Sequence, residues 1–235
     1  SNPKAHVVYW DGIFNYSAIN NFGAAHAKGD YLLLLNNDTE IISPDCLEQL
    51  LGYCMRPDVG AVGARLYYED DTVQHAGIVV GIGGNARGIG QNMFMGLQRA
   101  RSGYLHKASL ALDYSAVTAA CLMVKRSIYE AVGGFEEKLA VAFNDVDFCL
   151  RLREKGWRIV WTPYAELYHH ESKSRGSDEE DPAKKARFAK EQARLYEVHG
   201  KQNILHDPYY NPNLSLDYED FRESGDLRNL KNVTL

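Results

Sequence analysis

An uninterrupted apolar run at residues 31–35, followed at once by a polar turn at 36–38, constrains the fold more than any other feature. Five apolar residues without alternation are typical of a strand that is covered on both faces, as in a parallel sheet between helix layers. A helical pattern at 44–55 and a second apolar strand at 59–67 come next. This strand–helix–strand order predicts an α/β fold.

Regular patterns continue along most of the chain. The segment 44–55 has apolar residues at i, i+3, i+4 and i+7 counted from Leu47, behind Ser43 and Pro44 as capping residues. Glycines are frequent between residues 70 and 113, which predicts turns there more than regular elements. The other predicted elements are strands at 5–10, 116–124, 158–162 and 165–169 and helices at 16–28, 145–155 and 182–199.

The composition fits one large globular domain with an appendage. The 235 residues are 45% hydrophobic and 24% charged, and the formal net charge is −5. A negative charge argues against a nucleic-acid-binding protein, whose surface would be basic. Four widely spaced cysteines build neither a zinc ribbon nor a disulfide framework. The plain interpretation is a cytoplasmic protein with buried thiols, and no apolar stretch reaches the roughly 18–20 residues that span a bilayer.

The polar turn after the first apolar strand is a candidate metal site. Ligands of open α/β sheets bind outside the carboxyl ends of the strands, which is where Asp38 is expected. Asp and Asn oxygens suit Mg²⁺ or Mn²⁺. The alternative is an Asx turn made by Asn36, Asn37 and Asp38, and from this segment alone the turn is the more frequent case.

Two further groups of polar residues follow strand or helix boundaries. Asp145 and Asp147 are two residues apart, so on a helix they cannot share one face, and only one of them can point into a site. Both can equally be first-turn acids favoured by the helix dipole. His169 and His170 end a strand and point in opposite directions, so at most one of them joins a given metal. A structural role is the commoner one for a lone histidine.

The order of these groups resembles a known enzyme family. The segments that carry the resemblance are GDYLLLLNNDTEI, AACLMVKRSIYEAVGGFEE and NDVDFCLRLREKGWRIVWTPYAELYHHESKSRG. They are similar to the family 2 glycosyltransferases, inverting enzymes with the GT-A fold. The resemblance is greatest to bacterial members that build O-antigen and other surface polysaccharides, including rhamnosyltransferase-like enzymes. It covers about residues 5–176.

The resemblance implies an α/β GT-A fold over residues 1–176, with a mostly parallel central sheet and flanking helices. Residues 177–235 are then a C-terminal helix and an extended tail that pack on this domain. Family members open with two nucleotide-binding strands of the types SIIIPTYN and IIVVDNGS, and nothing similar precedes Ala5. We therefore expect an N-terminally truncated domain that is inactive by itself. Its exposed sheet edge would favour self-association into a homo-oligomer.

The resemblance also implies roles for single residues. Asp38 matches the last acid of the metal-binding DxD-like motif, and His169 matches the histidine that completes the metal site, with His170 as the alternative. Asp145 matches the general base that deprotonates the acceptor hydroxyl. The implied cofactor is Mg²⁺ or Mn²⁺.

Other positions are expected to contact the donor or depart from the family pattern. Asn36 stands where many relatives carry an acid, and it is expected with Asn37 beside the donor. Asn144 replaces the usual Glu before the base. Arg175 would reach the diphosphate when the segment that carries it closes, although a solvated loop arginine is the commoner case. The QxxRW segment of processive synthases is absent.

The implied function is transfer of a sugar, with inversion, from a nucleotide-diphosphate sugar to a glycan or lipid-linked acceptor in bacterial surface polysaccharide synthesis. Peripheral association with the inner face of the cytoplasmic membrane is consistent with such an acceptor. The alternative is a non-catalytic, degenerate transferase module that acts as a scaffold or glycan-binding domain. A metal-dependent hydrolase would need more acidic or histidine ligands.

Overall fold

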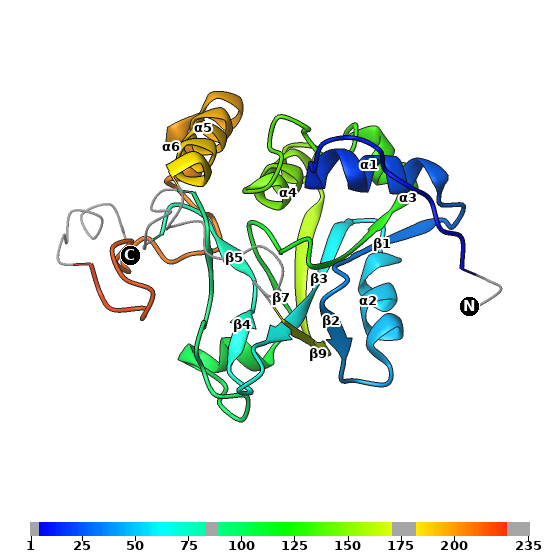
Figure 1. Ribbon diagram of the computed structural model, residues 1–235. Coiled ribbons are helices and arrows are strands. Elements are labelled where there is room, and N and C mark those ends of the chain that lie inside the picture. Colours follow the sequence, from blue (N-terminus) through cyan, green and yellow to red (C-terminus); the bar gives the residue numbers. More distant parts are fainter. Residues whose placement is uncertain (1–4, 83–88, 171–181, 225–235) are drawn as a thin grey trace.

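The computed structural model describes residues 5–82, 89–170 and 182–224, and a seven-stranded mixed sheet lies at its centre (Figure 1). The main path of the sheet has the order β1 (Tyr31–Leu35), β8 (Cys121–Lys125), β3 (Val59–Tyr67), β9 (Arg158–His169) and β2 (Thr39–Ile41). Two strands join it from the side, β4 (Val73–His75) against β3 and β7 (Leu112–Asp113) against β9. A separate pair consists of β5 (Ile78–Val79) and β6 (Gln91–Asn92).

Within the described part of the chain, only β3 and β9 run parallel, and every other pairing is antiparallel. The α/β class with flanking helices is confirmed, but the expectation of a mostly parallel sheet is wrong. The reason lies in β1. Its sequence is apolar throughout, yet Leu32 and Leu34 are buried while Leu35 is 42% exposed. The burial therefore alternates, which an antiparallel strand accommodates as well.

Helices cover both faces of the sheet. On one face α2 (Cys46–Cys54) packs its fully buried Leu50 and Cys54 against β3, β8 and β9. On the other face lie α1 (Tyr16–His26), α3 (Arg126–Ala131) and α4 (Asn144–Glu154), as Figure 1 shows. Because β3 lies between the two layers, all of its residues are buried. A 3₁₀ segment at Tyr104–Ser109 lies outside these layers.

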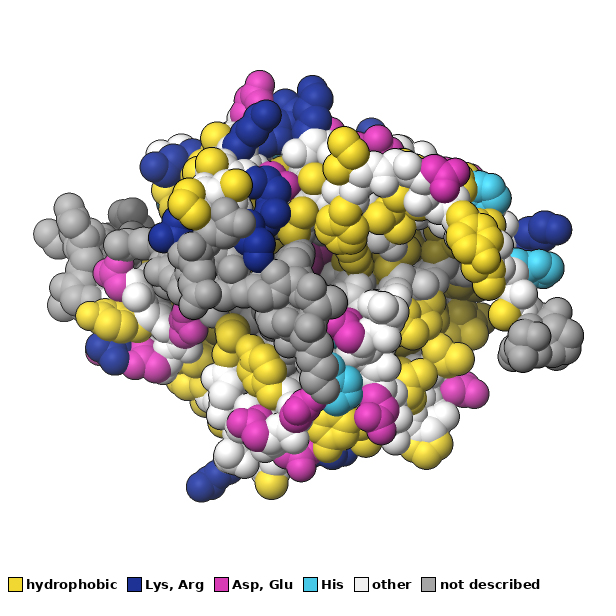
Figure 2. Space-filling model, viewed as in Figure 1, with side chains coloured by type: hydrophobic (Ala, Val, Ile, Leu, Met, Phe, Trp, Pro, Cys, Tyr) yellow, Lys and Arg dark blue, Asp and Glu magenta, His cyan; other side chains and the backbone are white. Residues whose placement is uncertain are grey.

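The C-terminal helices α5 (Pro182–His199) and α6 (Lys201–Ile204) pack into the core on the side of the sheet that carries α1, α3 and α4. Leu195, Ile204, Tyr210 and Leu214 belong to the same buried cluster as the residues of α4 and β8. Lys and Arg side chains gather over α5 on the face shown in Figure 2. No helix in the part of the chain described here is long and apolar enough to cross a bilayer.

The N-terminal segment does not form the strand predicted at 5–10. Val7, Tyr9 and Ile13 are 72%, 80% and 93% exposed, and this edge of the molecule is rich in exposed apolar side chains (Figure 2). β1 pairs with β8, and no described strand offers the N-terminal segment backbone partners. Trp10 of this segment contacts Phe22 of α1 edge-on, with the two ring centroids 5.6 Å apart.

The other predicted elements agree with the structure to within two residues at most ends. The strands predicted at 158–162 and 165–169 are one continuous strand, β9. Pro163 is tolerated inside it because the pairing with β3 shifts register there. Trp161 pairs with Gly63 and Glu166 with Arg65, so the proline lies in a bulge of β9.

Candidate active site

The turn after β1 brings Asp38 to one end of the sheet. The hydroxyl of Thr39 donates to the carbonyl oxygen of Asn36 at 2.8 Å and closes the turn. The backbone N–H of His170 donates to the carbonyl oxygen of Asp38 at 2.9 Å. One carboxylate oxygen of Asp38, Oδ1, is buried and has no hydrogen-bond partner among the described residues. It lies 3.3 Å from Nε2 of His169.

His169 is the last residue of β9 and lies opposite Thr39 in the sheet. Its Nδ1 atom lies 2.7 Å from Oε1 of Gln74, a buried residue of β4. Its Nε2 atom lies 3.2 Å from the side-chain nitrogen of Asn36. Residues from three separated segments, the β1 turn, β4 and the end of β9, therefore meet at this corner.

The corner fits a divalent cation bound by few protein ligands. A buried carboxylate oxygen without a partner is costly, and a cation between Asp38 and Nε2 of His169 would satisfy both atoms. No cluster of three or more Asp, Glu, His or Cys side chains suited to a metal occurs within residues 5–82, 89–170 and 182–224. Mg²⁺-type ions often bind to one or two carboxylates and complete their shell with substrate phosphates and water.

The other predicted residues of this region differ in their surroundings. His170 lies between two carboxylates, with Nδ1 2.8 Å from Glu69 and Nε2 3.6 Å from Glu40, so its ring is occupied away from the Asp38 carboxylate. Asn37 is exposed in the turn. Arg175 lies outside the described residues.

Asp145 lies in the first turn of α4 and faces the start of β8. Its Oδ2 accepts the backbone N–H of Ala119 at 3.3 Å, and its Oδ1 accepts its neighbour's N–H, that of Val146, at 2.8 Å. Burial raises the pKa of this carboxyl above its ordinary value, and these N–H donors together with Thr118 only partly offset the effect. A carboxylate with a raised pKa is a stronger base than an ordinary aspartate.

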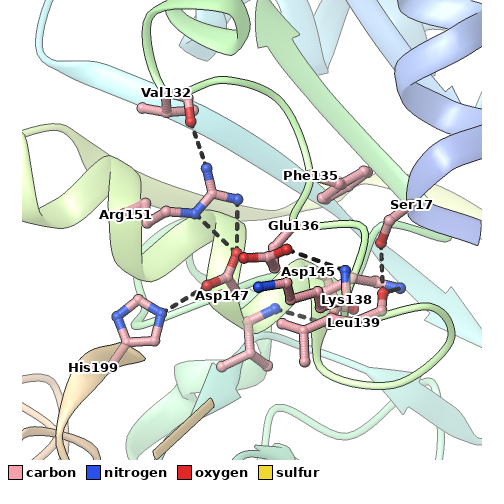
Figure 3. A network of polar contacts seen from close by, with 12 residues as sticks. Ser17, Val132, Phe135, Glu136, Lys138, Leu139, Asp145, Asp147, Arg151 and His199 are labelled. Carbon is pink, nitrogen blue, oxygen red and sulfur yellow. Dashed lines mark hydrogen bonds and ion pairs between the residues drawn. The ribbon is translucent and has the colours of Figure 1, made fainter. Parts of the chain in front are cut away.

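Asp147 is bound on the opposite side of α4 (Figure 3). Its Oδ2 accepts from Arg151 at 2.9 and 2.7 Å, and its Oδ1 lies 2.9 Å from Nε2 of His199 in α5. Burial opposes the charge of Asp147, but His199 and Arg151 outweigh it and lower the pKa of the carboxyl. All three contacts are internal, so this carboxylate joins α4 to α5.

The loop before Asp145 is held from two helices. Backbone N–H groups of Val141 and Ala142 donate to the buried carboxylate of Glu191 in α5 at 3.0 and 2.9 Å. The hydroxyl of Ser17 in α1 donates to the carbonyl oxygen of Leu139 at 2.6 Å (Figure 3). Phe143 then has a left-handed conformation (φ 61°), which costs about 1–3 kcal/mol for a bulky residue unless its surroundings hold it.

A series of hydrogen bonds connects Asp145 with the candidate metal corner, where Asp38 and His169 meet. The hydroxyl of Tyr16 lies 3.0 Å from the carbonyl oxygen of Ala119, whose own N–H donates to Asp145. The same hydroxyl lies 3.1 Å from Oδ1 of Asn36, which is adjacent to His169. Burial and the charges of Asp145 and Asp38 raise the pKa of Tyr16, so the phenol stays protonated.

Sequence reasoning missed Tyr16, Gln74 and His75. His75 is buried, with its Nδ1 atom 2.6 Å from Oδ1 of Asn92, and burial lowers the pKa of its imidazole to about 4. Gln74 and His75 lie in the glycine-rich region, where the only available indication was a polar pair inside the short run VQH before Gly77.

Gly77 has a φ of +90°, and a Cβ there would come within 2.3 Å of the Tyr114 ring.

Comparison with known proteins places this arrangement in a family. The model of a family described as "Glycosyltransferase like family 2" matches residues 14–194. The chain belongs to glycosyltransferase family 2. The match extends from the end of the N-terminal segment into α5, so this family 2 domain includes Asp38, His169 and both sides of α4.

Two curated relatives are similar over most of this family 2 chain. Protein y4gI of Sinorhizobium fredii is 49% identical over 209 residues, which are 88% of this chain and 22% of the relative. The "O-antigen biosynthesis protein RfbC" of Myxococcus xanthus is 39% identical over 215 residues, which are 92% of this chain and 16% of the relative. The chain thus spans about a fifth of the length of these relatives.

A solved structure confirms the GT-A fold. The structure titled "Crystal structure of GalNAc-T7 with UDP, GalNAc and Mn2+" superimposes with a TM-score of 0.58 at 12% identity. The superposition covers 81% of this chain and 36% of that one. At this identity the likeness concerns the fold alone.

Proposed function

We propose that this chain carries the metal-binding and acceptor-activating part of an inverting glycosyltransferase. Its substrates would be a nucleotide-diphosphate sugar and a hydroxyl of a glycan or lipid-linked acceptor in bacterial surface polysaccharide synthesis. One observation carries the proposal, the unpartnered Oδ1 of Asp38 facing Nε2 of His169 in a family 2 domain. The similarity to the Myxococcus xanthus O-antigen biosynthesis protein supports the pathway.

Asp145 is the general base of the proposed reaction. Its carboxylate takes the proton of the acceptor hydroxyl as that oxygen attacks the anomeric carbon. The nucleoside diphosphate leaves from the opposite face, so the configuration inverts. The N–H groups of Ala119 and Val146 hold the carboxylate in position. Proton transfer to a positioned base of this kind contributes about 10²–10⁴-fold to the rate.

Asp38 and His169 are the residues that would hold Mg²⁺ or Mn²⁺, with donor diphosphate oxygens completing the coordination. When bound, the ion offsets the negative charge that grows on the leaving diphosphate. Asn36, with its amide 3.2 Å from His169 and 3.1 Å from Tyr16, lies at the side of this corner where the donor would approach.

The metal assignment is tested in the longest natural polypeptide that carries this chain, with Asp38→Ala. Binding of Mn²⁺ together with UDP, GDP or dTDP is measured by calorimetry. We expect the variant to lose metal-dependent nucleotide binding, because the carboxylate that faces Nε2 of His169 is gone. Asp45→Ala is the matched control, since Asp45 is an exposed carboxylate in a neighbouring turn that accepts from the side chain of Gln49.

Binding by Asp38→Ala that equals the wild type would overturn the metal assignment. Release of nucleoside diphosphate from a panel of sugar nucleotides, with a membrane extract as the acceptor source, then separates enzyme from scaffold. A wild-type protein that binds donor but never releases diphosphate under these conditions would support the scaffold hypothesis instead.

A further inference from the structure

Both ends of the Gln74 side chain contact His169. Oε1 of Gln74 lies 2.7 Å from Nδ1 of the imidazole, and Nε2 of Gln74 lies 3.2 Å from the backbone carbonyl oxygen of the same histidine. Gln74 is 4% exposed and comes from β4, whereas His169 ends β9. The buried amide of Gln74 thus contacts both the imidazole and the backbone of His169.

Donor and acceptor counting fixes the protons in this contact. The backbone carbonyl of His169 can only accept, so the amide end that meets it must be the NH₂ group of Gln74. The other end is then the amide oxygen, which also only accepts, so Nδ1 of His169 must carry a proton. A neutral imidazole has one N–H. Nε2 therefore carries the lone pair, which accepts from the side-chain NH₂ of Asn36 at 3.2 Å.

The same nitrogen also lies at the proposed metal corner. Nε2 lies 3.3 Å from the unpartnered Oδ1 of Asp38, and both atoms are acceptors in this tautomer. In the opposite tautomer, Nε2 would carry a proton and could not bind a cation. Its N–H would also face the side-chain NH₂ of Asn36, which is itself a donor.

We propose that Gln74 is a positioning residue that fixes the Nδ1–H tautomer of His169 and so keeps Nε2 and Asp38 Oδ1 available to a divalent cation. This inference rests on the metal site of the proposed function and adds a residue that no sequence motif identified. Partners that orient a metal-binding histidine in this way contribute about 10–100-fold to metal affinity.

Three variants test the role in the longest natural polypeptide that carries this chain. Gln74→Met keeps the length of the side chain and removes both hydrogen bonds to His169. Gln74→Glu restores the acceptor for Nδ1–H. The matched control is Tyr67→Phe, which removes a buried hydroxyl that bonds to Glu166, so it also takes a polar contact from β9 without touching His169. Circular dichroism identifies variants that fold.

The first readout is the ¹⁵N chemical shifts of the neutral His169 imidazole in the metal-free protein. We expect the Nδ1–H tautomer in the wild type, in Gln74→Glu and in Tyr67→Phe, and a shift toward Nε2–H in Gln74→Met. Retention of the wild-type tautomer in Gln74→Met would overturn the proposal. If Gln74→Met fails to fold, an Nε2–H tautomer in Gln74→Glu would overturn it equally.

The second readout is binding of Mn²⁺ alone, followed by the electron paramagnetic resonance of the free ion. We expect Gln74→Met to weaken binding about 10–100-fold, with Gln74→Glu close to the wild type. An affinity of Gln74→Met equal to that of Tyr67→Phe would overturn the role. If even the wild type binds no Mn²⁺, the metal part of the proposed function fails, whereas the tautomer measurement still decides whether Gln74 orients His169.

Discussion

The two sides of α4 hold their carboxylates in opposite ways, although Asp145 and Asp147 are separated by one residue. Asp147 is saturated by Arg151 and His199, and these partners lower its pKa. Asp145 receives the N–H groups of Ala119 and Val146 and the Thr118 side chain, but burial outweighs them and raises its pKa. Identical side chains thus become a structural ion pair in one case and the proposed base in the other, and the partners supplied by other segments make the difference.

Asp38, at the proposed metal corner, resembles Asp145 more than Asp147 in this comparison. Asp38 also keeps an unsatisfied oxygen, and its nearest partner, His169, is turned so that an acceptor faces an acceptor. Carboxylates that complete their bonds inside the protein stabilise it, whereas those left incomplete are available to a ligand. The predictions below test this division between the two sides of α4.

The largest effect is expected for activity in Asp145→Asn. Removing the base should lower the rate of sugar transfer about 10²–10⁴-fold while Mn²⁺-dependent donor binding survives. Because the raised pKa means that the native state prefers the protonated carboxyl, the charged form costs stability as the pH rises through that pKa. The neutral amide should therefore leave the melting temperature at neutral pH unchanged or higher. A wild-type transfer rate would remove Asp145 as the base.

Asp147→Asn should show the reverse pattern. It leaves Arg151 and His199 without their buried partner, so the free energy of unfolding should fall by about 3–5 kcal/mol. Urea denaturation measures this loss, and donor binding by the molecules that remain folded should change little. Should Asp147→Asn be as stable as the wild type but inactive, the assignment of roles to the two carboxylates would have to be exchanged.

The smallest effect concerns the pH dependence of stability through His199. Burial opposes the charge of this imidazole, but hydrogen bonds to Asp147 and Glu154 outweigh it and raise its pKa above the ordinary 6.5. Its contribution is therefore complete below pH 6.5 and is lost as the pH rises through the raised pKa.

Urea midpoints measured across this range should decline in the wild type with rising pH. They should stay nearly flat in His199→Gln, which cannot gain the charge. Equal slopes in the two proteins would show that the bond between α4 and α5 does not depend on a protonated histidine.

Local patterns predicted much of the fold, because they depend on neighbours in sequence. The helix at 182–199 and the apolar runs at 31–35 and 59–67 follow from periodicity and capping, and the structure has all three. Strand direction could not be predicted, since burial on both faces is compatible with either pairing. The segment 5–10 failed as a strand because β propensity alone supplies no backbone partner.

The candidate site was predictable only where the chain carries family motifs. Asp38, Asp145 and His169 came from such motifs, and they remain predictions with the geometry described above. Tyr16, Gln74 and Glu191 could not be found in this way, because each contacts residues about 50 to 100 positions away through side chains of ordinary type. Such convergence depends on tertiary packing, which no local pattern encodes.

The two contacts from α5 have a practical meaning for anyone who shortens this protein. A cut after residue 176, where the motifs end, would discard Glu191 and His199 together, and even the end of the family match at 194 falls short of His199. The backbone of Val141 and Ala142 would lose its acceptor, and Phe143 could relax from its left-handed conformation. The smallest fragment that keeps both contacts therefore extends at least through α5.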